Sequence, residues 1–110
     1  MSHQNDAQRL TQCIGVIVRT PAGATSAFAI DEQDTADRLI ERAADWFVTR
    51  DLLEPGRALA ADERFRLGLV RGTTIVDLEP DAELLAEGLV EGDVLHLLNR
   101  EPQVDGHCLR

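Results

Sequence analysis

Residues 35–50, TADRLIERAADWFVTR, decide the fold of this chain. Apolar side chains recur there at intervals of three and four residues, at Ala36, Leu39, Ile40, Ala43 and Phe47. On a helix this spacing forms one apolar stripe, and the charged side chains fall on the opposite side. Strand-like segments lie on both sides of the helix in the sequence, so its stripe has to pack against a sheet. The stretch therefore predicts an α+β fold with one main helix.

The ends and the edge of this helix carry their own signals. Asp34 or Thr35 is predicted to cap the helix by accepting a hydrogen bond from its first free amides. The acidic side chain of Asp37 suits the positive end of the helix dipole. Trp46 lies at the edge of the apolar stripe, where we expect it at the rim of the core.

The segments around the helix predict strands. Residues 13–20, CIGVIVRT, are β-branched or apolar at nearly every position, which is typical of a central strand. A turn at 21–24 leads into a hairpin partner at 25–30. Further strands are predicted over 65–70, 73–77 and 94–98, with one short helical turn over 81–87. We expect a mixed sheet of about five strands on one main helix, with the two most apolar strands, the first and the last, parallel at its centre.

Length and charge limit the classes of protein to consider. The 110 residues predict a domain at 12–100, a flexible leader at 1–11 and a flexible tail at 101–110. A formal net charge of −9 argues against nucleic acid and anionic membranes as partners, and favours other proteins. No apolar run is long enough to span a bilayer, and the leader lacks the apolar core of a signal peptide, so we expect a cytoplasmic protein.

No pattern typical of an active site occurs in the sequence. Ser2 and Ser26 lie outside any nucleophile motif, and the three histidines are scattered. His107 and Cys108 form one adjacent pair, which has too few ligands for a zinc site. We therefore predict that the protein is not an enzyme and holds no cofactor or metal. All 11 basic side chains are arginine, so no side chain can become an isopeptide acceptor.

The segment LEPDAELLAEGLVEGDVLHLLNR, Leu78–Arg100, resembles the last third of ubiquitin-like domains. In those domains a short helical turn with a leucine is followed by a glycine, a tight turn and a terminal apolar strand. Leu95-His96-Leu97 even repeats the Leu-His-Leu of ubiquitin. The resemblance covers about residues 13–100 and implies the ubiquitin-like β-grasp fold. That fold hosts modifiers, sulphur carriers and binding modules, so it does not by itself choose between them.

The chain is similar to two bacterial groups. One comprises ubiquitin-like modifiers of bacterial conjugation operons, including operons linked to antiphage defence. That resemblance implies three partners: an activating enzyme, a conjugating enzyme and a processing protease. The other group comprises YukD-type proteins of type VII secretion loci, which implies a non-conjugated protein-interaction module. Exposed Val or Leu on an edge strand would also allow self-association.

The resemblance implies an interaction surface at Leu69, His96 and Leu98, near the apolar patch through which ubiquitin meets its readers. This prediction depends on the register of residues 65–70. A slip of one residue exchanges the buried and exposed faces of a strand. In the alternative interpretation Leu69 and Leu98 are ordinary core leucines.

The tail carries the second functional signal. Conjugated ubiquitin-like proteins end in glycine, because the terminal carboxylate must thread a narrow channel and a side chain there would obstruct it. Gly106 stands about as far beyond the last strand as the final glycines of ubiquitin do. The chain lacks a Gly-Gly pair and continues with four residues from His107. A modifier would therefore need a protease to cut between Gly106 and His107; the alternative is a frayed tail with an incidental Asp-Gly.

Overall fold

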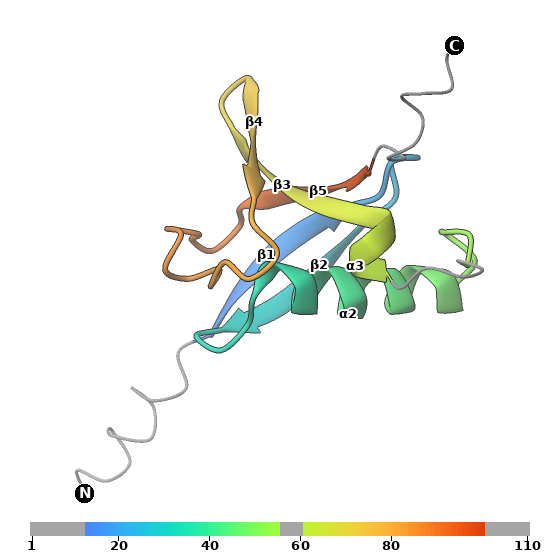
Figure 1. Ribbon diagram of the computed structural model, residues 1–110, viewed down its shortest axis with the longest axis horizontal. Coiled ribbons are helices and arrows are strands. Elements are labelled where there is room, and N and C mark those ends of the chain that lie inside the picture. Colours follow the sequence, from blue (N-terminus) through green and yellow to red (C-terminus); the bar gives the residue numbers. More distant parts are fainter. Residues whose placement is uncertain (1–12, 56–60, 101–110) are drawn as a thin grey trace, which may run out of the picture.

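The computed structural model describes residues 13–55 and 61–100. One long helix, one short helix and five strands make up this part of the chain (Figure 1). In sequence order they are β1 (Cys13–Arg19), β2 (Thr25–Asp31), α2 (Ala36–Thr49), α3 (Ala61–Arg64), β3 (Phe65–Arg71), β4 (Thr74–Leu78) and β5 (Val94–Asn99). For α2 and the five strands these bounds agree with the predicted ones to within one or two residues.

The five strands form one mixed sheet in the order β2-β1-β5-β3-β4. β1 and β5 lie side by side at its centre and are parallel, with Ile17 opposite Val94. The pairs β1–β2, β3–β4 and β3–β5 are antiparallel. The predicted parallel pairing of the first and last strands is therefore confirmed, as is the predicted hairpin of the first two strands.

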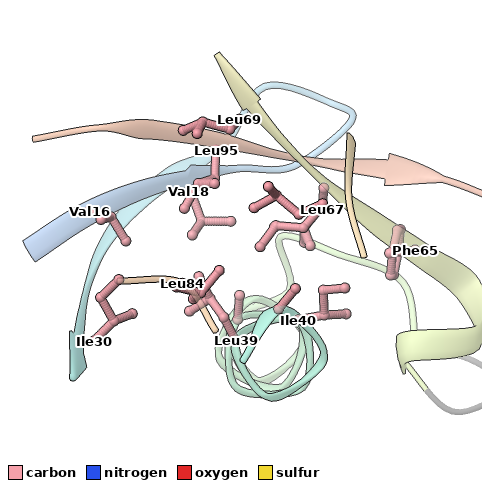
Figure 2. Packing of buried hydrophobic residues seen from close by; sticks show 14 of the residues in the cluster. Val16, Val18, Ile30, Leu39, Ile40, Phe65, Leu67, Leu69, Leu84 and Leu95 are labelled. Carbon is pink, nitrogen blue, oxygen red and sulfur yellow. The ribbon is translucent and has the colours of Figure 1, made fainter. Parts of the chain in front are cut away.

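Helix α2 crosses one face of the sheet and covers the core (Figure 1). All five residues of the predicted apolar stripe are buried, and Phe47 is fully enclosed. Figure 2 shows Leu39 and Ile40 of the helix pointing toward Val16 and Val18 of β1. Removing such side chains from water is the main stabilising contribution to the fold.

The start of α2 differs from the prediction. Thr35 has an extended backbone, but no side chain caps the helix. Instead, the N–H of Ala36 donates to the carbonyl of Ala82 over 3.0 Å, and the N–H of Asp37 donates to the carbonyl of Pro80 over 2.9 Å. The Asp34 carboxylate accepts a hydrogen bond from the N–H of Asp31. The prediction of a side-chain cap is wrong because the 80–82 backbone already satisfies these helix amides.

Residues 81–87 contain the single helical turn that the sequence predicts, because the N–H of Glu87 donates to the carbonyl of Glu83, four residues earlier, over 3.1 Å. The inward direction of Leu84 is also confirmed, because its side chain is fully buried in the core. Gly88 ends the segment with φ +94°, a left-handed conformation that glycine adopts without strain. This connection leads back to β5 at the centre of the sheet.

Trp46 lies at the rim of the core, as predicted. Its ring is half-buried and meets Phe28 and Phe47 edge-to-face at centroid distances of 5.9 and 5.2 Å. The guanidinium of Arg50 lies 4.0 Å above the Trp46 ring, a cation–π contact. These ring contacts pack the rim of α2 against Phe28 of β2.

Candidate interaction surface

The register of β3 decides which of its side chains can meet a partner. Leu67 lies opposite Leu97, and Leu69 lies opposite Leu95. Both β5 leucines are fully buried, and Leu69 belongs to the same core cluster with 4% of its surface exposed. Placing Leu69 on the interaction surface is therefore wrong. Its side chain follows Phe65 and Leu67 into the core, because alternate residues of a strand share one face.

His96 and Leu98 lie on the other face of the sheet. Each alternates along β5 with a fully buried leucine, and each is partly exposed. Figure 1 shows α2 over one face of the sheet. His96 and Leu98 alternate with core leucines along β5, so their side chains lie on the other face. The structure therefore brings His96 and Leu98 together, without Leu69, on the side where a partner could reach them.

Apolar side chains from neighbouring strands extend this surface. Paired residues of adjacent strands share a face, so the register places further residues beside His96 and Leu98. Each of them is partly or largely exposed. The surface, called the outer face below, consists of Ile17, Val70, Ile75, Val94, His96 and Leu98. Each residue other than His96 lies two positions along its strand from His96 or from a residue that shares its face on an adjacent strand. Once the register is known, this two-residue spacing identifies them from the sequence.

Gly68 makes the outer face continuous between β5 and β4. It lies directly opposite His96 and has no side chain to separate its neighbours. A Cβ at Gly68 would come within 2.4 Å of Ile75 Cγ2 and 2.9 Å of Leu98 Cδ1. Ile75 and Leu98 therefore close over the glycine from both sides. The result is one apolar surface where two separate patches would otherwise stand.

Ion pairs lie toward both ends of β3. Arg66, opposite Leu98, holds Asp77 with an N–O distance of 3.2 Å. The guanidinium of Arg71 donates two hydrogen bonds of 3.0 and 3.2 Å to the carboxylate of Asp93. The N–H of Val90 donates to the same carboxylate over 2.8 Å. Burial alone would raise the pKa of Asp93. The hydrogen bonds from Arg71 and Val90 and the positive charge of Arg71 outweigh burial and hold that pKa below its ordinary 3.8.

The predicted processing site, Gly106 and His107, lies outside the described residues. The structure does show where the chain leaves the domain. The Arg100 N–H donates to the Arg64 carbonyl over 2.9 Å, and its guanidinium donates to the Phe65 carbonyl over 3.2 Å. These two hydrogen bonds hold Arg100, the last described residue, beside the start of β3.

Other features of the described residues point to no particular chemistry. A groove of about 470 Å³ lies beyond the end of α2, lined by Leu52, Leu53, Arg64 and Asn99 among others. Over 13–55 and 61–100, no three His, Cys, Asp or Glu side chains gather where they could hold a metal ion. In the same part of the chain, no helix is long and apolar enough to cross a membrane.

The backbone resembles solved ubiquitin-like structures. A de novo designed protein based on ubiquitin is 19% identical with a TM-score of 0.61, over 82% of this chain and 92% of that one. The ubiquitin-like domain of PLXNC1 is 13% identical with a TM-score of 0.62, over 81% of this chain and all of that one. The ubiquitin-like domain of an Arabidopsis thaliana protein is 14% identical with a TM-score of 0.58, over 84% and 82%. No sequence family and no curated protein matches the chain.

These similarities confirm the predicted fold. The chain has an α+β, ubiquitin-like β-grasp fold, in which one helix packs on a mixed sheet of five strands. At 13–19% identity the similarity concerns the backbone alone. Function therefore has to be argued from the surface of this chain.

Proposed function

We propose that this chain is a ubiquitin-like protein-interaction module that binds another protein through the outer face of its sheet. The observation that carries the proposal is the continuous apolar surface that Ile75 and Leu98 form over Gly68. Contiguous exposed apolar surface mostly marks a binding site, because leaving it in water costs free energy. Ubiquitin-like domains in general mediate protein interactions, which supports the same conclusion.

The composition of the outer face fits a protein partner. Aliphatic side chains around His96 form the apolar centre of this surface, and the Arg66–Asp77 ion pair forms part of its polar rim. This division into apolar centre and polar rim is common in protein interfaces. The net charge of −9 favours partners with basic surfaces and disfavours nucleic acid and anionic membranes.

Affinity capture with matched variants tests this proposal. Leu98→Arg puts a charge beside Gly68 within the outer face, whereas Val90→Arg makes the same change at a loop residue that is 59% exposed. Proteins of the native host that the wild type and Val90→Arg retain, and Leu98→Arg loses, are candidate partners. Circular dichroism checks that both variants are folded. If Leu98→Arg retains every protein that Val90→Arg does, the outer face is not the binding site.

A second candidate function is that of a conjugated modifier of a bacterial conjugation operon, such as one linked to antiphage defence. The observation that favours it is that a hydrogen bond to the Phe65 carbonyl holds Arg100 at the end of the domain, and the six residues Glu101–Gly106 follow in the sequence. Fully extended, six residues reach roughly 20 Å, enough to carry a terminal glycine away from the domain. The absence of lysine also removes any side-chain acceptor that could compete within the chain.

This modifier would work with three partner proteins. A protease would remove His107–Arg110, and an activating enzyme would adenylate the carboxylate of Gly106 using ATP. A conjugating enzyme would then transfer the chain to its target. A non-conjugated protein of a type VII secretion locus would need none of these enzymes. The genes beside the coding sequence therefore distinguish the two settings.

Intact-mass spectrometry tests the modifier candidate. Incubation with the protease of its own locus should release the peptide of residues 107–110. ATP and the activating enzyme should then give an adenylate or covalent adduct at Gly106. Gly106→Glu should block adduct formation, while Val104→Ala should allow it. If a chain ending at Gly106 forms no ATP-dependent adduct, the modifier candidate is rejected and the interaction module stands.

A further inference from the structure

The two edges of the sheet differ in how they meet the solvent. In the order β2-β1-β5-β3-β4, the edge strands are β2 and β4. An edge strand presents unpaired N–H and C=O groups, which another strand can use unless something covers them. The contrast between these two edges predicts how this chain can assemble.

The β2 edge is covered by a charged side chain from α2. Arg42 Nη2 donates to the carbonyl of Ala29 over 2.6 Å. The same guanidinium lies 3.6 Å from the carboxylate of Asp34, which holds it in place. An arriving strand would have to displace this guanidinium. Strand pairing at the β2 edge is therefore disfavoured beside Ala29.

The β4 edge is open within the described residues. Arg71 and Thr74 flank a two-residue turn at Gly72, so they form a hydrogen-bonded pair. Alternation along the ladder then directs the N–H and C=O groups of Ile75 and Asp77 away from β3. No hydrogen bond described over 61–100 joins these outward groups to another residue. In Figure 1 the β3–β4 hairpin projects beyond the rest of the domain, which leaves its edge accessible.

The side chains of β4 suit pairing with an apolar strand. Four of its five residues are exposed, and Val76 has 47% of its surface in contact with solvent. Val76 lies opposite Leu69, so it shares the α2 side of the sheet and not the outer face. The one charged residue of the strand is Asp77, which is paired with Arg66 in the same chain.

We propose that two copies of this chain pair through antiparallel β4 strands, centred on Val76, and form one continuous sheet. Ile75 and Asp77 of each copy would exchange backbone hydrogen bonds with Asp77 and Ile75 of the other. The two Val76 side chains would meet on the twofold axis as a non-hydrogen-bonded pair, with Cα atoms about 4.5 Å apart.

Local charge and the disfavoured β2 edge together favour a second copy as the partner. Because Arg66 already neutralises Asp77, self-pairing brings no unpaired like charges together at the strand. Because Arg42 occupies the Ala29 carbonyl on β2, further strands pair there less readily than at β4, which favours assembly into two copies. The dimer uses the backbone of Ile75 and leaves the outer-face side chains on the side of the sheet opposite Val76, so this inference goes beyond the proposed binding function and does not depend on it.

Sedimentation of the full chain tests the proposal. We expect a monomer–dimer equilibrium that shifts toward the dimer between about 0.05 and 0.5 M salt, since salt screens repulsion between two chains of charge −9. Val76→Arg would place two guanidinium groups on the axis and weaken dimerisation at least about tenfold. Val90→Arg, with the same change of charge, should dimerise like the wild type. A monomer at every concentration, or equal effects of both variants, would overturn the proposal.

Disulfide trapping gives an independent readout. In a chain with Cys13→Ser and Cys108→Ser, Val76→Cys should form an intermolecular disulfide with oxidised glutathione as the oxidant. The expected Cα distance of about 4.5 Å at the axis lies within the range that a disulfide spans. Val90→Cys, also exposed, should cross-link much more slowly. Equal rates for the two cysteines would place the contact elsewhere than at β4.

Discussion

Gly68 of β3 lies directly opposite His96 of β5, and this pairing fixes the direction of every other side chain on both strands. It turns Leu69 toward the core and leaves His96 beside a residue without a side chain. Ile75 and Leu98 fill the space above the glycine. The same pairing thus accounts for a buried leucine that the sequence placed on the surface, and for the continuous apolar surface on the opposite face.

The register predicts opposite effects at neighbouring positions of β3. Leu69→Arg would bury a charge without a partner and should lower the free energy of unfolding by more than about 3 kcal/mol. Val70→Arg points to the partly exposed outer face and should cost about 1 kcal/mol or less. Denaturant titration of both variants measures the difference. Equal losses would show that the register of β3 is not the one described.

The packing of α2 on the sheet predicts a large effect at Phe47. Its side chain is fully buried in the core, so Phe47→Ala should leave a cavity and lower the free energy of unfolding by about 3–5 kcal/mol. Thr49→Ala, on the exposed side of the same helix, is the control and should change it by about 0.5 kcal/mol or less. A loss below about 1 kcal/mol for Phe47→Ala in denaturant titration would mean that the helix does not cover the core.

The ion pair of Asp93 predicts a dependence of stability on pH. Its folded-state pKa is lowered below 3.8, so the stabilising contribution of the carboxylate is present above the unfolded pKa and is lost as pH falls through the folded one. Asp93→Asn should therefore be less stable than the wild type at pH 7, and the two should converge below about pH 4. Urea titrations across this range measure the convergence.

The control for this prediction is Asp45→Asn on the exposed side of α2, which should change the stability little at either pH. A gap between wild type and Asp93→Asn that stays constant from pH 7 to pH 3 would rule out titration of the Asp93 carboxylate as the cause.

The sequence predicted the elements and their order because their signals are local. The three- and four-residue spacing of Leu39, Ile40 and Phe47 marks the buried side of α2 without reference to any other element. The apolar character of residues 13–20 and 94–98 marked the central strands in the same way. Each of these features can be read within one segment, so each was confirmed.

Features that depend on contacts between distant segments were predicted less well. The Asp34 carboxylate accepts from Asp31 while the 80–82 backbone satisfies the first helix amides, and neither contact leaves a local signal. The outer face likewise depends on which residue of β3 stands opposite His96. Shifting the β3 register by one residue would place Leu69, and not Gly68, on the outer face. Hydrophobicity alone did not determine the register, since residues 67, 69 and 70 are all aliphatic.

The central claim is that the outer face binds a protein partner, and titration of one purified partner with matched variants tests it most directly. Isothermal calorimetry should give a Kd for Leu98→Arg at least about tenfold higher than for the wild type, since a charge within the apolar surface of an interface disrupts its packing. Val90→Arg, with the same change of charge at an exposed residue that is not one of the outer face, should bind as the wild type does. Equal affinities for all three proteins would contradict the claim.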